Sequence, residues 1–97
     1  MSYQLMIRLA AQAEAAEIHD WYEARSTGLG GRFADALEEC LRSIQQNPRG
    51  LQIRKGKFRH DMVARFPDRV VFTVDGDTVF VYQVRHTSRR PSKRFGP

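Results

Sequence analysis

The sequence lacks the features of secreted, disulfide-stabilised and membrane proteins. It holds a single cysteine, Cys40, which cannot form an internal disulfide and fits the reducing cytoplasm. No apolar run approaches the roughly 20 residues that a membrane-spanning helix needs. The apolar stretch near the N-terminus is short and is interrupted by Arg8, which is atypical of a signal peptide. We therefore expect a cytoplasmic globular protein, and 97 residues predict a single domain over residues 1–97.

Arrangements typical of metal sites and of nucleophilic catalysis are also missing from the sequence. The three histidines, His19, His60 and His86, do not stand at metal-ligand spacing from one another or from Cys40. The glycines of residues 26–31 lie between predicted helices and not after a strand, which is the wrong context for a phosphate-binding loop. We expect neither a metal nor another cofactor.

Acidic residues are scarce in the second half of the chain, and none follows Asp77. Residues 1–48 hold four basic and seven acidic residues, a net charge of −3, whereas residues 49–97 hold twelve basic and four acidic residues, a net charge of +8. The two halves together give the +5 of the whole chain. A basic half of this kind is expected to attract a polyanion or an acidic protein. The alternative, that these residues only keep the surface solvated, stays open at this point.

Two amphipathic helices are predicted in the first half, after a short apolar strand over residues 3–9. The helix over 11–25 places apolar residues at helical spacing and puts its acids, Glu14 among them, on the opposite side. Three glycines predict a turn over 26–31, because glycine breaks helices. The second helix covers 32–46 and ends at Asn47-Pro48. So short a connection predicts an antiparallel helical hairpin.

The second half has the pattern of strands. One strand is predicted near 57–66, and two more, rich in β-branched and aromatic residues, over 70–74 and 78–84. The turn Asp75-Gly76-Asp77 between the last two is typical of a β-hairpin. The order β-α-α-β-β-β predicts an α+β fold in which the helical hairpin packs on a small antiparallel sheet.

Basic side chains gather on these predicted strands and after them. Residues two apart on a strand share a face, so Lys55, Lys57 and Arg59 are expected on one side, with Arg65 in phase if no bulge intervenes. Arg69 starts one strand and Arg85-His86 ends its neighbour, so these residues are expected to meet at one end of the sheet. Arginines with a histidine could stabilise phosphate charge and move a proton; a solvated rim with a basic tail over about 88–97 is the alternative. The candidates for target or partner binding are Arg59, Arg65, Arg85, Arg89, Arg90, Lys93 and Arg94.

Several short motifs together resemble the ParE/RelE superfamily of bacterial type II toxins, which are often labelled plasmid stabilisation proteins. They are A-E-I-H-D-W-Y-E at 16–23, G-L-G-G-R-F-A-D-A-L-E at 28–38, N-P at 47–48, F-R…A-R-F-P within 58–67 and V-R-H-T-S-R-R-P at 84–91. The resemblance covers nearly the whole chain in the right order. It implies a small cytoplasmic toxin of the predicted fold, held inactive by a small acidic antitoxin encoded by a neighbouring gene.

The resemblance also implies two classes of target. RelE-like members cut messenger RNA on the ribosome without a metal, and ParE-like members poison DNA gyrase. The RelE-like catalytic arginine corresponds to Arg69, but a second arginine falls on Thr87, a lysine pair falls near His60 and Met62, and the tail tyrosine has no match besides Phe95.

The ending His86-x-x-Arg89 is more ParE-like, although Asp68 and Lys93-Arg94 depart from that pattern, which usually has tyrosine and an aromatic residue there. We therefore predict a toxin that inhibits DNA gyrase. The alternatives are a ribosome-dependent mRNA endonuclease, in which Arg69 and His86 would be catalytic, and a degenerate toxin that only binds its antitoxin and regulates the operon.

Overall fold

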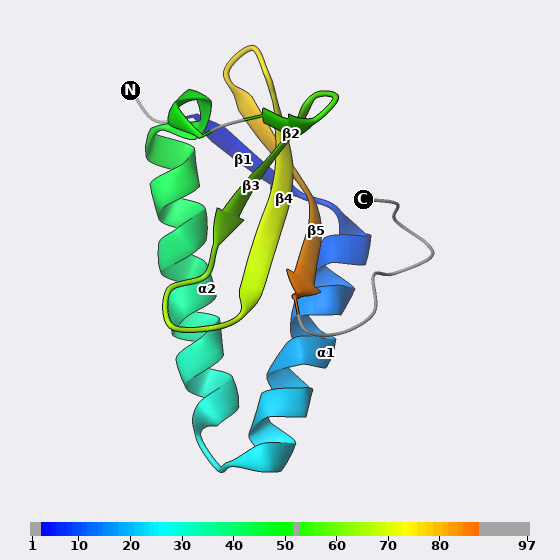
Figure 1. Cartoon of the computed structure of the whole chain (residues 1–97), viewed down its shortest axis with the longest axis vertical. Helices are drawn as coiled ribbons and strands as arrows, with labels where there is room; N and C mark the ends of the chain where they lie inside the picture. Colours follow the sequence, from blue (N-terminus) through cyan, green and yellow to red (C-terminus); the bar gives the residue numbers. More distant parts are fainter. Residues whose placement is uncertain (1–2, 52, 88–97) are drawn as a thin grey trace.

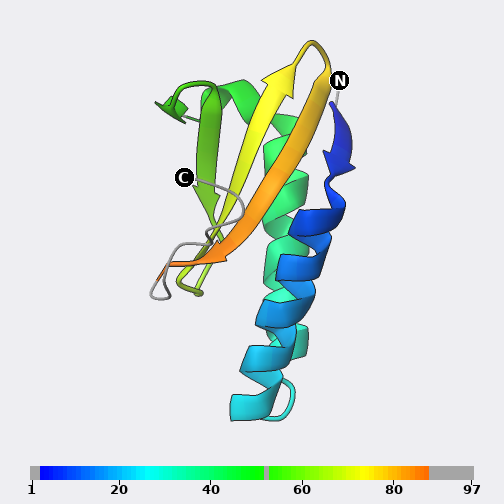
Figure 2. The same cartoon turned by 90° about the vertical axis from the view of Figure 1, so that its right-hand side faces the viewer.

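The computed structural model describes residues 3–51 and 53–87. The chain forms strand β1 (Gln4–Ile7), helices α1 (Leu9–Arg25) and α2 (Leu29–Gln46), a short 3-10 turn η1 (Pro48–Gly50), and strands β2 (Ile53–Lys55), β3 (Phe58–Met62), β4 (Asp68–Asp75) and β5 (Thr78–His86) (Figure 1). Seen from the side, α1 and α2 lie on the same face of the sheet (Figure 2).

The predicted α+β fold, a helical hairpin packed on a small sheet, is confirmed, and the sheet differs from the prediction in two details. Its strand order is β1-β5-β4-β3-β2, with β1 parallel to β5 and the other pairs antiparallel, so the sheet is mixed. The segment predicted as one strand near 57–66 takes part in a hairpin, because Gly56, with φ of 57°, reverses the chain between β2 and β3.

The core lies between the sheet and the helical hairpin. Every second residue of β4 faces the helices, and Val70 and Phe72 are fully buried there. A β-bulge interrupts the pairing of β4 with β5: Val71 pairs with Gln83 and Phe72 with Val81, which leaves Tyr82 as the extra residue. The bulge shifts the alternation of β5, so the residues beyond it face the opposite side from the one that simple alternation predicts. The main core side chains are Ala11, Ile18, Tyr22, Phe33, Ile44, Val63, Val70, Phe72, Val79, Val81 and Val84.

The turn between the helices is shorter than predicted, because Gly30 and Gly31 lie in the first turn of α2. The Glu23 carboxylate accepts hydrogen bonds from the backbone N–H groups of Gly28 (2.9 Å) and Gly30 (3.0 Å), which otherwise lack helical partners. These two bonds lower the pKa of Glu23. Gly30 also lies against α1, since a Cβ atom there would stand 2.8 Å from the carbonyl oxygen of His19. Capping and close packing therefore explain why a glycine-rich segment starts a helix.

The expectation that Glu14 lies on the solvent side of α1 is wrong, because Glu14 lies on the buried side. Its Oε1 atom accepts a hydrogen bond of 3.0 Å from the backbone N–H of Val84 in β5. Strand β1 ends at Ile7 and pairs only with the first half of β5, as far as Val81. The Glu14 side chain thus bonds an amide of β5 beyond the end of β1, and a buried amide without an acceptor would be costly.

Candidate functional site

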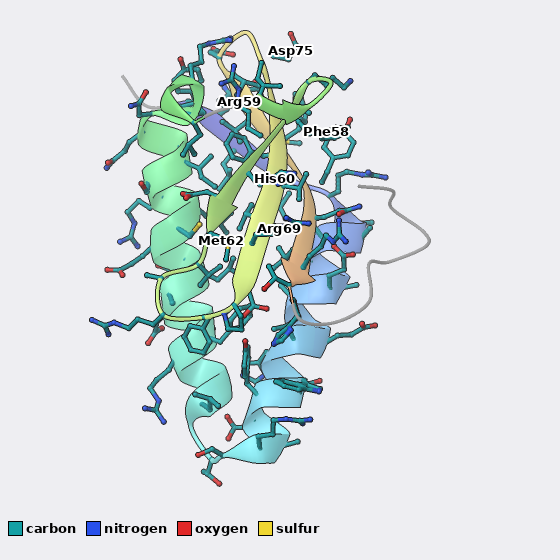
Figure 3. All side chains as sticks on the ribbon, in the orientation of Figure 1. Phe58, Arg59, His60, Met62, Arg69 and Asp75 are labelled. Carbon is teal, nitrogen blue, oxygen red and sulfur yellow. The ribbon has the colours of Figure 1, made fainter. Side chains whose placement is uncertain are left out.

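The face of the sheet opposite the helices, here called the open face, carries the candidate site. In β4 the residues between the core positions point to this face, and cross-strand partners share it. Figure 3 shows the sheet in front of the helices and labels Phe58, His60, Met62, Arg69 and Asp75. The open face comprises Phe58, His60 and Met62 of β3, Arg69, Val71, Thr73 and Asp75 of β4, and Thr78, Phe80, Tyr82, Gln83 and Arg85 of β5.

Arg69 and Arg85 lie directly opposite each other on β4 and β5, so the predicted meeting of these residues at one end of the sheet is confirmed. Partial burial lowers the pKa of Arg85, the charge of Arg69 lowers it further, and the charge of Glu14 acts in the opposite direction. The Nε atom of Arg69 is buried and has no hydrogen-bond partner among the residues that the structure describes. The pair therefore concentrates positive charge at this end of the sheet.

His86 lies on the other face of the sheet, against α1. Its ring centroid is 5.0 Å from that of Trp21 and 5.8 Å from that of Tyr22, and 9% of the residue is exposed. The cross-strand partner of His86 on β4 is Asp68. Asp68 is fully buried and accepts a 2.5 Å hydrogen bond from the Tyr22 hydroxyl. Burial, together with the Asp68 carboxylate, raises the pKa of Tyr22. The two residues predicted as catalytic for a nuclease, Arg69 and His86, thus face opposite sides of the sheet.

The prediction that basic residues form a row along one strand is wrong. Lys57 lies in the turn between β2 and β3, and Arg65 lies after β3, exposed and with φ of 70°. Arg59 has a structural contact, because its Nη1 atom donates hydrogen bonds to the carbonyl oxygens of Leu51 and, at 3.4 Å, Arg49. The remaining predicted binding residues, Arg89, Arg90, Lys93 and Arg94, lie outside the described residues.

An aromatic pair on the open face was not anticipated from the sequence. The rings of Phe58 and Tyr82 meet edge to face with centroids 5.1 Å apart, and the guanidinium group of Arg8 lies 4.7 Å from the centroid of the Tyr82 ring. Simple alternation along 78–84 would place Tyr82 correctly but would place Gln83 and Arg85 on the helix side. The bulge decides their side, and nothing in the residue pattern marks it.

Arg65 borders a groove of about 710 Å³ between α2 and the turn that joins β3 to β4. Its lining carries charges of both signs, so it does not select an anionic partner. The lining residues are Leu29, Arg32, Asp35, Ala36, Glu38, Glu39, Arg42, Ala64, Arg65 and Phe66.

Cys40 of α2 is a buried free cysteine. Burial, reinforced by Asp61, raises the pKa of the Cys40 thiol to about 12, which keeps it protonated. Within residues 3–51 and 53–87, no group of three or more histidine, cysteine or acidic side chains is placed to hold a metal ion. None of the described helices is long and apolar enough to cross a membrane.

The fold is similar to three solved toxin structures. The chromosomal ParDE toxin–antitoxin system of P. aeruginosa superposes with a TM-score of 0.76 at 18% identity, covering 90% of this chain and 98% of that one. A variant of the E. coli toxin RelE in the free state gives 0.68 at 20% identity, with 91% and 86% covered. The RelBE2 toxin–antitoxin complex of Mycobacterium tuberculosis gives 0.62 at 16% identity, with 89% and 92% covered.

At the level of sequence, a comparison with curated proteins gave no match. The family model of the ParE toxin of type II toxin–antitoxin systems, parDE, matches residues 5–91, which span almost all of the described structure. This chain therefore belongs to the family of ParE toxins of type II toxin–antitoxin systems.

Proposed function

We propose that this type II toxin acts in the cytoplasm by inhibiting DNA gyrase. The observation that carries the choice of target is the placement of Arg69 and His86 on opposite faces of the sheet. Metal-free cleavage of RNA needs proton-transferring groups within hydrogen-bond reach of the phosphate that is being held. His86 packs against Trp21 on the helix side, away from the arginine pair. A toxin that acts by binding gyrase needs no such proton transfer.

A ribosome-dependent mRNA endonuclease is the second candidate, and one observation favours it. His60 of β3 shares the open face with Arg69, since its cross-strand partner, Val71, is two residues along β4 from Arg69. A histidine can act as a general acid or base near neutral pH. His60, and not the buried His86, is therefore the residue whose removal separates the two functions most cleanly.

A small acidic antitoxin is the proposed partner. The half of the chain that builds β2 to β5 carries a net charge of +8, which favours association with an acidic protein. The similar structures from P. aeruginosa and M. tuberculosis are toxin–antitoxin systems, which supports an antitoxin for this chain as well.

The test is a supercoiling assay with purified gyrase and the purified toxin, run beside an assay of messenger cleavage on translating ribosomes. We expect the wild type to inhibit supercoiling, and His60→Ala to inhibit it equally. Codon-phased cleavage that falls about 10²–10⁴-fold in His60→Ala, with supercoiling untouched by either protein, would establish the endonuclease in place of the gyrase inhibitor.

A further inference from the structure

The arginine pair is an unfavourable arrangement for the protein alone. Like charges directly opposite each other on antiparallel strands destabilise a sheet. Glu14 is the carboxylate that acts on Arg85, but its Oε1 atom already accepts the hydrogen bond from the Val84 amide. The two guanidinium groups lie on directly opposed positions of β4 and β5. An oxyanion placed between them would supply the opposite charge and accept hydrogen bonds from their accessible N–H groups.

The surroundings of the pair fit a protein partner better than a nucleic acid. Met62, the cross-strand partner of Arg69 on β3, is 52% exposed, and exposed methionines are common at protein-binding surfaces. A nucleic acid backbone needs cations that follow its phosphates, whereas β4 continues from Arg69 through Val71 and Thr73 to the exposed Asp75. One concentrated cation site beside an apolar side chain is suited to one acidic side chain with apolar neighbours.

We propose that Arg69 and Arg85 together bind a carboxylate of an aspartate or glutamate side chain of the antitoxin, next to an apolar contact on Met62. The inference rests on the proposed partner and adds the chemistry by which that partner recognises the open face. Arginine binds carboxylates through two parallel N–H groups, which gives the contact direction as well as strength. A partner that covers the pair also removes it from water, and this strengthens the interaction.

This arrangement predicts effects of opposite sign on folding and on binding. Arg85→Gln removes the repulsion between the arginines, so the free toxin should keep or gain stability against urea. The same change removes half of the carboxylate site, so affinity for the antitoxin should fall about 10- to 100-fold. Arg32→Gln is the matched control, since it removes the same charge from an exposed position on α2. It should change affinity less than about 3-fold, because exposed charges contribute little.

The experiment is isothermal titration of each toxin variant with the purified protein encoded by the adjacent gene, beside urea unfolding of each free toxin. Arg85→Gln and Arg69→Gln that bind as tightly as Arg32→Gln would overturn the carboxylate site and leave gyrase inhibition standing. A loss of stability parallel to the loss of affinity would show that the pair is structural, which also overturns it. Absence of binding by the wild type would remove the proposed partner together with the site.

A further titration distinguishes a carboxylate ligand from a nucleic-acid phosphate. A short single-stranded RNA is titrated into the complex of wild-type toxin and the neighbouring protein. We expect no displacement. Displacement that depends on Arg85 would assign the pair to a phosphodiester and overturn the proposal.

Discussion

The hydroxyl of Tyr22 donates a 2.5 Å hydrogen bond to the fully buried carboxylate of Asp68, and this bond joins α1 to the first residue of β4. His86 is the cross-strand partner of Asp68, so Tyr22, Asp68 and His86 lie together where β5 ends. A buried carboxylate is tolerated only when it is hydrogen-bonded. The buried carboxylate of Asp68 is therefore accommodated by the hydroxyl of Tyr22.

Removing the hydroxyl should destabilise the fold. Tyr22→Phe keeps the ring and its packing but takes a donor from a buried carboxylate, which should lower the free energy of unfolding by about 1–3 kcal/mol. Urea denaturation followed by circular dichroism measures the change. Tyr82→Phe, on the open face, is the matched control and should shift stability by less than about 0.5 kcal/mol.

The same residue gives a dependence of stability on pH. The pKa of Tyr22 is raised in the folded protein above its ordinary value of 10.0, by burial and by Asp68. Above about pH 10 the unfolded chain loses this proton more readily than the folded chain, so stability falls as pH rises. Tyr22→Phe should lose less stability in this alkaline range than the wild type or Tyr82→Phe. Identical alkaline profiles for Tyr22→Phe and wild type would contradict this origin.

The buried carboxylate of Glu14 should contribute to the stability of the fold. Glu14→Ala leaves the buried Val84 amide without its acceptor and should cost about 1–3 kcal/mol. Glu14→Gln retains an acceptor oxygen and should cost less. Glu17→Ala, exposed on the same helix, serves as the control. Hydrogen exchange at the Val84 amide gives a local measurement, and unchanged protection in Glu14→Ala would show that the bond is dispensable.

Two neighbouring glycines of α2 should respond to alanine in opposite directions. At Gly30 the new Cβ would meet the His19 carbonyl oxygen at 2.8 Å, so the helices must separate, at a cost of about 1–3 kcal/mol. At Gly31 nothing lies within 4 Å, and alanine should stabilise the helix by about 0.5–1 kcal/mol. Thermal unfolding of both variants tests the packing of the helical hairpin, and equal effects would argue against it.

The basic residues beyond β5 give a prediction about toxicity. Changing Arg89 and Arg90, which lie outside the described residues, to alanine should leave the melting temperature nearly unchanged, because other residues form the core and the pairing of β4 with β5. We expect toxicity to fall sharply, since we assign these residues to contact with the target or partner. Growth after induction of the double variant measures this, and full toxicity would contradict the assignment.

The sequence predicted the fold well where residue type or spacing marks an element. β-Branched and aromatic residues over 70–74 and 78–84 located β4 and β5, and the expected antiparallel pairing brought Arg69 beside Arg85. Helical spacing of Ala11, Ile18 and Tyr22 located the buried side of α1.

Other expectations were wrong because the residue concerned has its partner in another element of the fold. From the sequence alone Glu14 is expected to be a solvated acid, because its partner, the Val84 amide of β5, is 70 residues away. From the sequence alone Gly30 is expected to break a helix. In the fold, Glu23 accepts a hydrogen bond from its N–H, and the His19 carbonyl of α1 leaves no room for a Cβ atom. The bulge at Tyr82 decides which residues share the open face, and single-sequence alternation has no sign of it.

Induced expression in cells distinguishes action on gyrase from cleavage of messages in a single experiment. Plasmid supercoiling and primer extension on cellular messages are measured from the same culture, for the wild type and for His60→Ala. We expect loss of negative supercoiling with intact messages, in both proteins alike. Messages cut in phase with codons by the wild type and spared by His60→Ala, with supercoiling unchanged, would contradict it.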